Sequence, residues 1–253
     1  MLARFARLLA LLLALLAALA TPLLAQNDTK TVRVFLFAGQ SNMVGSDSDP
    51  AEIELYPPFA DLAEPQTQVR YWYVIGREDK QRSRGWEALK PVGSTVGPEL
   101  SFGREVAART NAPIAIVKIA AGGTMLATDW NPDQPAGFEL YRLALATVRE
   151  ALADLDGKRV KWRLEGFVWH QGENDMFDDA ARKAYADNLT RFVACWRRDL
   201  DAPQLRFYLG ELCTKTIWGM DNRMPMNGIA EAQQRVAESD PFVDYVRTSH
   251  IAV

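Results

Sequence analysis

The chain has 253 residues and a mass of 28.3 kDa, a length that one α/β domain can fill. Hydrophobic residues make up 48% and charged residues 24%, so the composition excludes a collagen, a coiled coil and a wholly disordered chain. The net charge of −3 provides no basic field that would attract nucleic acid. The two histidines and two cysteines have spacings that match no zinc pattern, so we expect no metal site and no cofactor; they are His170, Cys195, Cys213 and His250.

Residues 1–25 are predicted to be a secretory signal peptide that precedes the domain. Two arginines come before an apolar run over 8–20, and small residues follow the run at cleavage points after Ala20 and Ala25. This run is shorter than the roughly 20 residues that a membrane-spanning helix needs. An uncleaved N-terminal anchor is the alternative. We expect the domain, residues 26–253, to be secreted or periplasmic, without stable membrane insertion after cleavage.

The two cysteines have two possible states in such a compartment. Cys195 and Cys213 either form a disulfide or remain two buried thiols. The sequence predicts neither the distance between them nor an oligomeric state.

Strands and helices alternate along the chain and predict a three-layer α/β domain. Short β-branched and aromatic runs predict five strands, at 32–38, 113–120, 162–169, 205–212 and 242–246. Amphipathic patterns between them predict helices at 98–110, 139–155, 178–200 and 227–239. This alternation is typical of a parallel sheet covered on both faces, with right-handed crossovers.

The stretch 46–96 departs from this alternation. It is rich in Pro, Asp, Glu and Gly, and residues 71–75 within it predict an edge hairpin. Long excursions at the strand ends of such a sheet tend to shape a substrate cleft. Aromatic residues here and downstream either form a sugar-stacking platform or pack in the core and its rim; they are Tyr71, Trp72, Tyr73, Trp86 and Trp130.

The first motif, Gly39-Gln-Ser-Asn-Met43, directly follows the first predicted strand. This position places Ser41 on the strand-to-helix turn, where an open α/β sheet presents its ligands. A serine there is a nucleophile if a base accepts its proton, or it caps the next helix. The side-chain amides of Gln40 and Asn42 can hold the turn by donating hydrogen bonds.

Two further polar loops follow predicted strands. Ala120-Ala-Gly-Gly-Thr-Met-Leu126 contains two glycines, which form either a tight turn or a backbone that aims an N–H at a developing oxyanion. Phe167-Val-Trp-His-Gln-Gly-Glu-Asn-Asp175 surrounds one glycine with polar side chains. Because the carboxyl ends of parallel strands meet at one edge of a sheet, we expect the three loops to converge.

These blocks, in this order, resemble those of the SGNH hydrolases, and most closely the branch with sialate O-acetylesterases and acetyl xylan esterases of carbohydrate esterase family 6. The similarity runs from Val32 to about Val246, and the combination of Gly39-Gln-Ser-Asn-Met43 with Gln171-Gly-Glu173 is its most specific part. The resemblance implies a flavodoxin-like fold with about five parallel strands. It also implies metal-free hydrolysis of acetyl esters on carbohydrates through an acyl-enzyme.

The resemblance assigns expected roles to particular residues. Ser41 resembles the nucleophile, and its own N–H and that of Gly122, or of the adjacent Gly123, resemble oxyanion donors. The third donor is either Asn174 or Gln171. In the same family pattern Glu173 resembles a positioning residue that accepts hydrogen bonds from the first-strand turn.

The catalytic base is not identified by the motifs. The resemblance implies an Asp-x-x-His block near the C-terminus, but His250 is preceded three positions earlier by Arg247, and Asp244 is the nearest upstream acid. Either His250 is the base, with Asp244 or another acid orienting it, or the block lies beyond Val253 and the domain is incomplete there. His170 lies inside the third block, where the family has no base.

The sequence therefore predicts a secreted serine esterase that removes O-acetyl groups from carbohydrate, with acetylated sialic acid and xylan as the main candidates. A non-catalytic carbohydrate-binding protein on the same fold and an esterase of lipids or simple esters are the alternatives.

Overall fold

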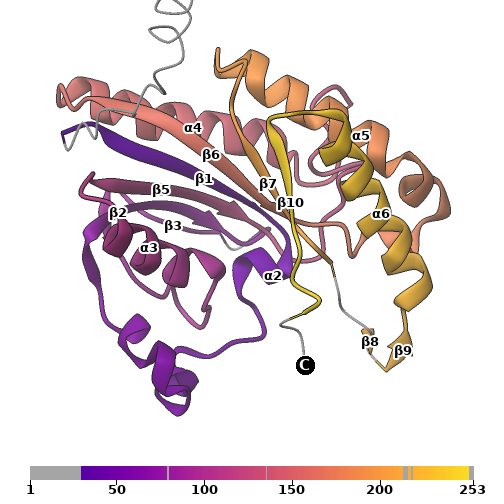
Figure 1. Cartoon of the computed structure of the whole chain (residues 1–253), viewed down its shortest axis with the longest axis horizontal. Helices are drawn as coiled ribbons and strands as arrows, with labels where there is room; N and C mark the ends of the chain where they lie inside the picture. Colours follow the sequence, from indigo (N-terminus) through magenta and orange to yellow (C-terminus); the bar gives the residue numbers. More distant parts are fainter. Residues whose placement is uncertain (1–29, 79, 135, 213–215, 218, 251–253) are drawn as a thin grey trace, which may run out of the picture.

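The computed structural model describes residues 30–78, 80–134, 136–212, 216–217 and 219–250. A mostly parallel sheet runs through the molecule in the order β10-β7-β6-β1-β5-β2-β3 (Figure 1). Its six mutually parallel strands are β1 (Val32–Gly39), β2 (Gln66–Ile75), β5 (Ile114–Ala120), β6 (Trp162–His170), β7 (Phe207–Gly210) and β10 (Val243–Val246). The short strands β3 (Gln81–Arg82) and β4 (Glu87–Leu89) pair antiparallel with β2, and β8 (Thr216–Ile217) with β9 (Met220–Asp221) forms a separate ribbon.

The α/β class and the five predicted strands are confirmed, and β2 is a sixth parallel strand. The sequence predicted only an edge hairpin there. The hairpin exists as the β2–β3 pair, but β2 also pairs in parallel with β5 from Val69 to Ile75. Only residues 71–75 of β2 form an uninterrupted apolar run, because both faces of the sheet are covered there: Trp72 packs in one core and Tyr71 in the other.

Helices cover both faces of the sheet. One face is covered by α4 (Leu140–Gly157), α5 (Asp179–Asp199) and α6 (Arg223–Ser239), and the other by α3 (Pro98–Arg109) with the 3₁₀ turns η1 (Pro50–Leu55) and η2 (Pro57–Ala63). Successive side chains of β1 point to opposite faces of the sheet and so belong to two separate cores. Leu36 packs toward α4 and α5, whereas Phe35 packs against Phe102 of α3. The four predicted helices are confirmed, although α6 begins four residues before the predicted start.

The large aromatic residues lie mainly in the core. Trp130 and Trp169 are fully buried and meet edge to face, with ring centroids 5.2 Å apart. Tyr71 and Trp72 are also buried in β2. The core-packing alternative is therefore correct for these residues, and they do not form a sugar-stacking platform.

Several expectations concern residues outside the described ranges. Residues 1–25 and Cys213 are among them, so the signal peptide and the disulfide stay predictions, and Cys195 is buried in α5. Within the described ranges, no helix has both the length and the apolar character needed to cross a membrane.

A buried ion pair joins α3 to the sheet. Lys118 on β5 donates from Nζ to Oε2 of Glu99 at 2.7 Å, and both side chains are almost fully buried. Tyr71 donates to the other oxygen of Glu99, and Lys118 also donates to the Val44 carbonyl of α2 (Ser41–Val44). Burial lowers the pKa of Lys118 and the adjacent carboxylate opposes that shift. The pair thus connects α2, α3, β2 and β5 directly behind the first motif.

We predict that Lys118→Met destabilises the fold by about 3–5 kcal/mol, because Glu99 is left as an uncompensated buried charge. Urea unfolding followed by circular dichroism measures this loss. The control is Arg109→Ala, which removes an exposed ion pair with Glu105 and should change the free energy of unfolding by less than about 0.5 kcal/mol. Equal effects of the two substitutions would contradict the structural role of Lys118.

Candidate active site

Ser41 is placed by a tight junction between β1, β5 and β6. A Cβ on Gly39 would lie 2.1 Å from the His170 carbonyl oxygen, so only glycine fits at the end of β1. Gln40 N–H donates to that same carbonyl, and Ala121 N–H donates to the Gly39 carbonyl. The chain then enters α2, and Ser41, its first residue, remains partly exposed.

Gly122 lies against Ser41 in van der Waals contact. A Cβ on Gly122 would be 3.6 Å from Cβ of Ser41, and any longer side chain would fill the space beside the hydroxyl. Within the described residues, neither the Ser41 nor the Gly122 backbone N–H donates to a protein acceptor, and the Ser41 hydroxyl has no hydrogen-bond partner. Two free N–H donors beside one free hydroxyl can bind an oxyanion as it forms.

The side chain of Gln40 holds the third loop against the first. Its Oε1 accepts from Gln171 Nε2 at 3.2 Å and from the backbone N–H groups of Gly172 and Asn174 at 3.3 and 3.4 Å. Its Nε2 donates to Oδ1 of Asn174 at 3.3 Å. Because Oδ1 of Asn174 is the atom that accepts this bond, its Nδ2 is left to donate elsewhere. That nitrogen lies 4.0 Å from the position of a Cβ on Gly123.

Gln171 is a fully buried connector. Besides Gln40, its Nε2 donates to the Thr124 carbonyl at 2.8 Å and to Oδ2 of Asp175 at 2.6 Å. Asp175 also accepts from the Leu126 and Ala127 N–H groups, and burial raises its pKa to about 6. The amide of Gln171 is therefore used to hold the second and third loops together.

Asn42 and Glu173 form a second connection between the first and third loops. Asn42 Nδ2 donates to Oε1 of Glu173 at 2.5 Å. Glu173 is 4% exposed, and its other oxygen, Oε2, is buried without a hydrogen-bond partner among the described residues. This is the contact that the sequence analysis expected of Glu173.

These loops enclose a cavity of about 790 Å³, which we call the Ser41 cavity. Residues of all three motifs line it together with Arg77 and other neighbours; the motif residues are Gln40, Ser41, Asn42, Gly122, Gly123, Glu173 and Asn174. Gln171 is not part of the lining. No group of three or more potential metal ligands occurs in the described part of the chain.

Arg77 was not identified by the sequence analysis. Its guanidinium lies 5.5 Å from the centre of the Phe138 ring and 3.3 Å from the position of a Cβ on Gly123. It follows β2 by two residues. Its place just after a strand is the same signal that the three motifs carry. This signal points to Arg77 only once β2 is recognised as a parallel strand that ends at the same edge of the sheet as β1, β5 and β6.

Neither histidine lines the Ser41 cavity. His170 packs against Gly210 and lines a separate apolar groove of about 650 Å³ between α3 and β10, where burial lowers its pKa. His250 is exposed on the segment after β10 and has no hydrogen-bond partner within the described residues. Asp244 forms an ion pair with Arg206 at 2.8 Å.

The family model for "Carbohydrate esterase, sialic acid-specific acetylesterase" matches residues 31–253. The chain belongs to this family. A curated relative, the "Probable carbohydrate esterase At4g34215" of Arabidopsis thaliana, is 28% identical over 184 residues. That match covers 68% of this chain and 66% of the relative's length.

Solved structures show the same fold. The Arabidopsis thaliana protein AT4G34215 superposes with a TM-score of 0.62 at 22% identity, covering 85% of this chain and 84% of its own. The carbohydrate acetylesterase XAC1771 from Xanthomonas citri gives 0.62 at 21% identity, with 87% of this chain and 50% of its own covered. NanS gives 0.64 at 18% identity, with 87% and 79% covered.

Proposed function

We propose that this chain is a secreted serine esterase that removes O-acetyl groups from carbohydrate through an acyl-enzyme. The observation that carries the proposal is the arrangement at Ser41: its hydroxyl, which has no partner among the described residues, lies beside two backbone N–H groups that are likewise unpaired there and beside the oriented amide of Asn174. Membership in a carbohydrate-esterase family supports the same activity. Secretion is proposed from the signal-like residues 1–25.

In the proposed reaction Oγ of Ser41 attacks the carbonyl carbon of the acetyl ester, and a base takes the hydroxyl proton. The carbonyl oxygen becomes negatively charged and accepts hydrogen bonds from the N–H groups of Ser41 and Gly122 and from Nδ2 of Asn174. The intermediate then collapses, and the sugar oxygen leaves with the proton. Water attacks the acetyl-Ser41 ester by the same steps and releases acetate.

Asn174 is proposed as the third oxyanion donor in preference to Gln171. Asn174 is partly exposed on the Ser41 cavity, and Gln40 fixes its amide so that the NH₂ group is the end left unpaired. Gln171 is buried, and its NH₂ group already has three acceptors. The two side chains therefore have different proposed functions: Asn174 contacts the reacting oxygen, and Gln171 positions the loops.

We predict that Asn174→Ala lowers kcat about 10²–10³-fold, because it removes the Nδ2 donor, while the free energy of unfolding falls by about 1 kcal/mol or less, because water in the cavity can replace Asn174 Oδ1 as the acceptor for Gln40 Nε2. Gln171→Ala should instead reduce the free energy of unfolding by about 1–3 kcal/mol, because it leaves buried polar partners unpaired. Hydrolysis of 4-nitrophenyl acetate and urea unfolding of both variants separate these effects. A stable Gln171→Ala variant with the larger loss of kcat would reverse the assignment.

His250 is proposed as the base, with an orienting acid other than Asp244. Its segment lies close to the site: Thr248, two residues before it, shares the groove at His170 with Asn42. Asp244 is already paired with Arg206, so it is not free to orient His250. The proposal requires the exposed imidazole to reach the Ser41 hydroxyl when substrate is bound.

We predict that His250→Ala lowers kcat/KM for 4-nitrophenyl acetate about 10²–10⁴-fold, because the proton acceptor is lost. The control is His170→Asn, because the His170 side chain lines the separate groove and not the Ser41 cavity. Only the first substitution should cause a loss of this size. A kcat/KM of His250→Ala equal to that of the wild type would exclude His250 as the base.

We predict that Ser41→Ala abolishes release of acetate and leaves the circular dichroism spectrum unchanged, because the hydroxyl is partly exposed and makes no contact needed for folding. Ser94→Ala, at another exposed serine, is the matched control. Turnover that survives in Ser41→Ala would remove Ser41 from the mechanism. Sugar binding without acetate release by the wild type would favour the binding-protein alternative, and a preference for long acyl chains would favour a lipid esterase.

A further inference from the structure

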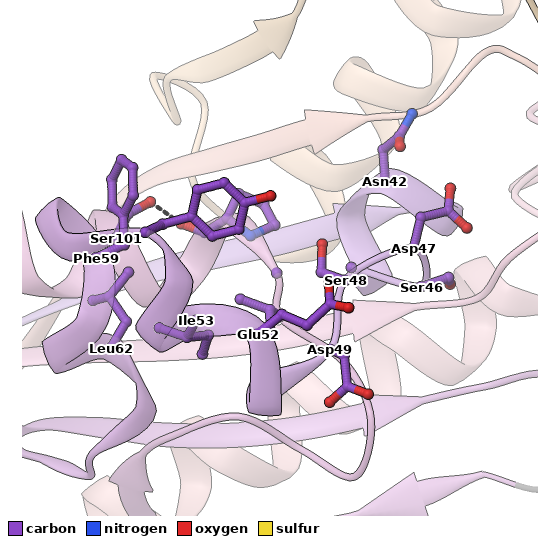
Figure 2. A pocket seen from close by; sticks show the side chains of 15 residues that line it. Asn42, Ser46, Asp47, Ser48, Asp49, Glu52, Ile53, Phe59, Leu62 and Ser101 are labelled. Atoms are coloured by element: carbon purple, nitrogen blue, oxygen red, sulfur yellow. Dashed lines mark hydrogen bonds between the residues drawn. The ribbon is translucent and has the colours of Figure 1, made fainter.

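A second cavity of about 500 Å³ adjoins the Ser41 cavity (Figure 2). We call it the η cavity, because η1 and η2 form much of its wall. Asn42, Ser46 and Asp47 line both cavities, so the two spaces meet beside the first motif. In Figure 2 these three residues lie at one end and Phe59 and Leu62 at the other. Its volume lies in the range of small-molecule sites, roughly 300–1,000 Å³.

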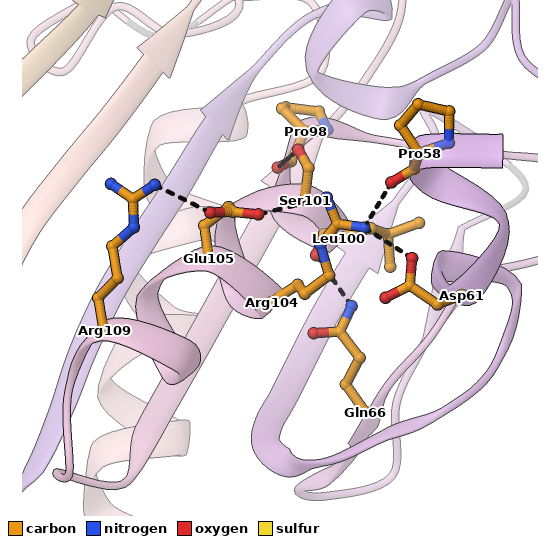
Figure 3. A network of polar contacts seen from close by, with 9 residues as sticks. All are labelled: Pro58, Asp61, Gln66, Pro98, Leu100, Ser101, Arg104, Glu105 and Arg109. Carbon is orange, nitrogen blue, oxygen red and sulfur yellow. Dashed lines mark hydrogen bonds and ion pairs between the residues drawn. The ribbon is translucent and has the colours of Figure 1, made fainter. Parts of the chain in front are cut away.

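The wall of the η cavity is anchored to α3. Arg104 donates to the Pro58 carbonyl at 2.9 Å and to Oδ1 of Asp61 at 2.6 Å (Figure 3). Its guanidinium also lies 5.7 Å from the centre of the Phe59 ring. Gln66, which follows η2, donates to the Leu100 carbonyl of α3 at 2.9 Å. These contacts fix η2 before any ligand binds, which lowers the entropy lost on binding.

The floor and rim of the η cavity combine apolar and aromatic groups. Ile53 and Leu62 are buried beneath it. Tyr56 is 60% exposed and Phe59 is 46% exposed. Exposed aromatic rings on a concave surface provide flat apolar faces on which a ligand can stack.

The charged side chains in the lining are all acidic. Asp47, Asp49 and Glu52 contribute carboxylates, and Ser46, Ser48 and Ser101 contribute hydroxyl groups. No lysine, arginine or histidine lines the cavity among the described residues, and none of the three carboxylates forms an ion pair there. The cavity therefore offers acceptors for neutral hydroxyl groups and repels anions.

We propose that the η cavity binds a neutral sugar unit that is linked to the acetylated sugar held in the Ser41 cavity. This inference rests on the proposed esterase function and specifies its substrate class. A pyranose has apolar C–H faces that stack on Tyr56 and Phe59, and hydroxyl groups that donate to Asp47, Asp49 and Glu52. The substrate is then an acetylated neutral oligosaccharide or polysaccharide, and free acetylated sialic acid, an anionic monosaccharide, leaves the η cavity empty.

The first experiment measures kcat/KM for acetylated xylotetraose and for 4-nitrophenyl acetate, which has no sugar to place in the η cavity. Tyr56→Ala should lower the ratio of the first value to the second about three- to tenfold. The matched control is Leu55→Ala, because Leu55 is the adjacent residue, is 73% exposed and does not line the cavity. Equal ratios in Tyr56→Ala and wild type would overturn the proposal.

The second experiment tests the charge of the η cavity. Glu52→Lys should raise kcat/KM for an acetylated xylo-oligosaccharide that carries a glucuronic acid, relative to the neutral oligosaccharide, at least about threefold. Glu54→Lys is the control, because Glu54 is an exposed acid of the same 3₁₀ turn outside the lining. An equal rise in both variants would show a general surface effect and overturn the charge argument.

Failure of the proposed function is distinguishable from failure of this inference. An enzyme that hydrolyses neither ester would refute the esterase, and the η cavity is then tested by calorimetric titration with unacetylated xylotetraose. Binding that weakens in Tyr56→Ala but not in Leu55→Ala would support the cavity. Binding that is absent in the wild type, or equal in both variants, would overturn it.

Discussion

The buried amide of Gln40 is the interaction on which the geometry of the site depends. Gln40 is 2% exposed, and its two amide atoms contact three residues of the loop after β6. A buried amide without hydrogen-bond partners lowers the free energy of unfolding by about 1–3 kcal/mol. The arrangement of the loops in which Gln40 keeps all its partners is therefore strongly favoured. In that arrangement Asn174 presents its NH₂ group beside Gly123. The residue before Ser41 thus orients the amide of Asn174, a side chain that lines the same cavity as Ser41.

A second network of buried hydrogen bonds, around Asp175, holds the loop after β5 in place in the same way. Asp175 accepts from two backbone N–H groups of that loop, and Gln171 links Asp175 to Gln40. With a pKa raised to about 6 by burial, the carboxylate is mostly ionised at neutral pH, where its three donors stabilise the charge. Tyr185 of α5 donates to the Gln171 carbonyl at 2.6 Å and so couples the network to the aromatic core. The loop that contains Gly122 is therefore held beside Ser41 by hydrogen bonds that connect it, through Asp175 and Gln171, to Tyr185 in the core.

The sequence predicted the elements and the convergence of the loops because both follow from local patterns. Periodicity identified the helices and five strands, and each motif stood directly after a strand. It did not predict the parallel pairing of β2, because the run 71–75 is buried on both faces of the sheet and therefore shows no alternation of apolar and polar residues. Arg77 was missed for the same reason. The choice between Gln171 and Asn174 depends on which amide finds acceptors in the fold, and spacing carries no information on that.

The strand order explains why the two cavities adjoin. The chain leaves β1 in the middle of the sheet, with β5 on one side and β6 on the other, and ligands bind at such a switch point because the loops diverge there. Gly122 approaches Ser41 from the β5 side and Asn174 from the β6 side. The connection that leaves α2 contains η1 and η2 and forms the wall of the η cavity before the chain returns in β2. The side chains of η1 and η2 take no part in the Gln40 or Asp175 networks, so this architecture allows the lining of the η cavity to change while the arrangement around Ser41 is kept.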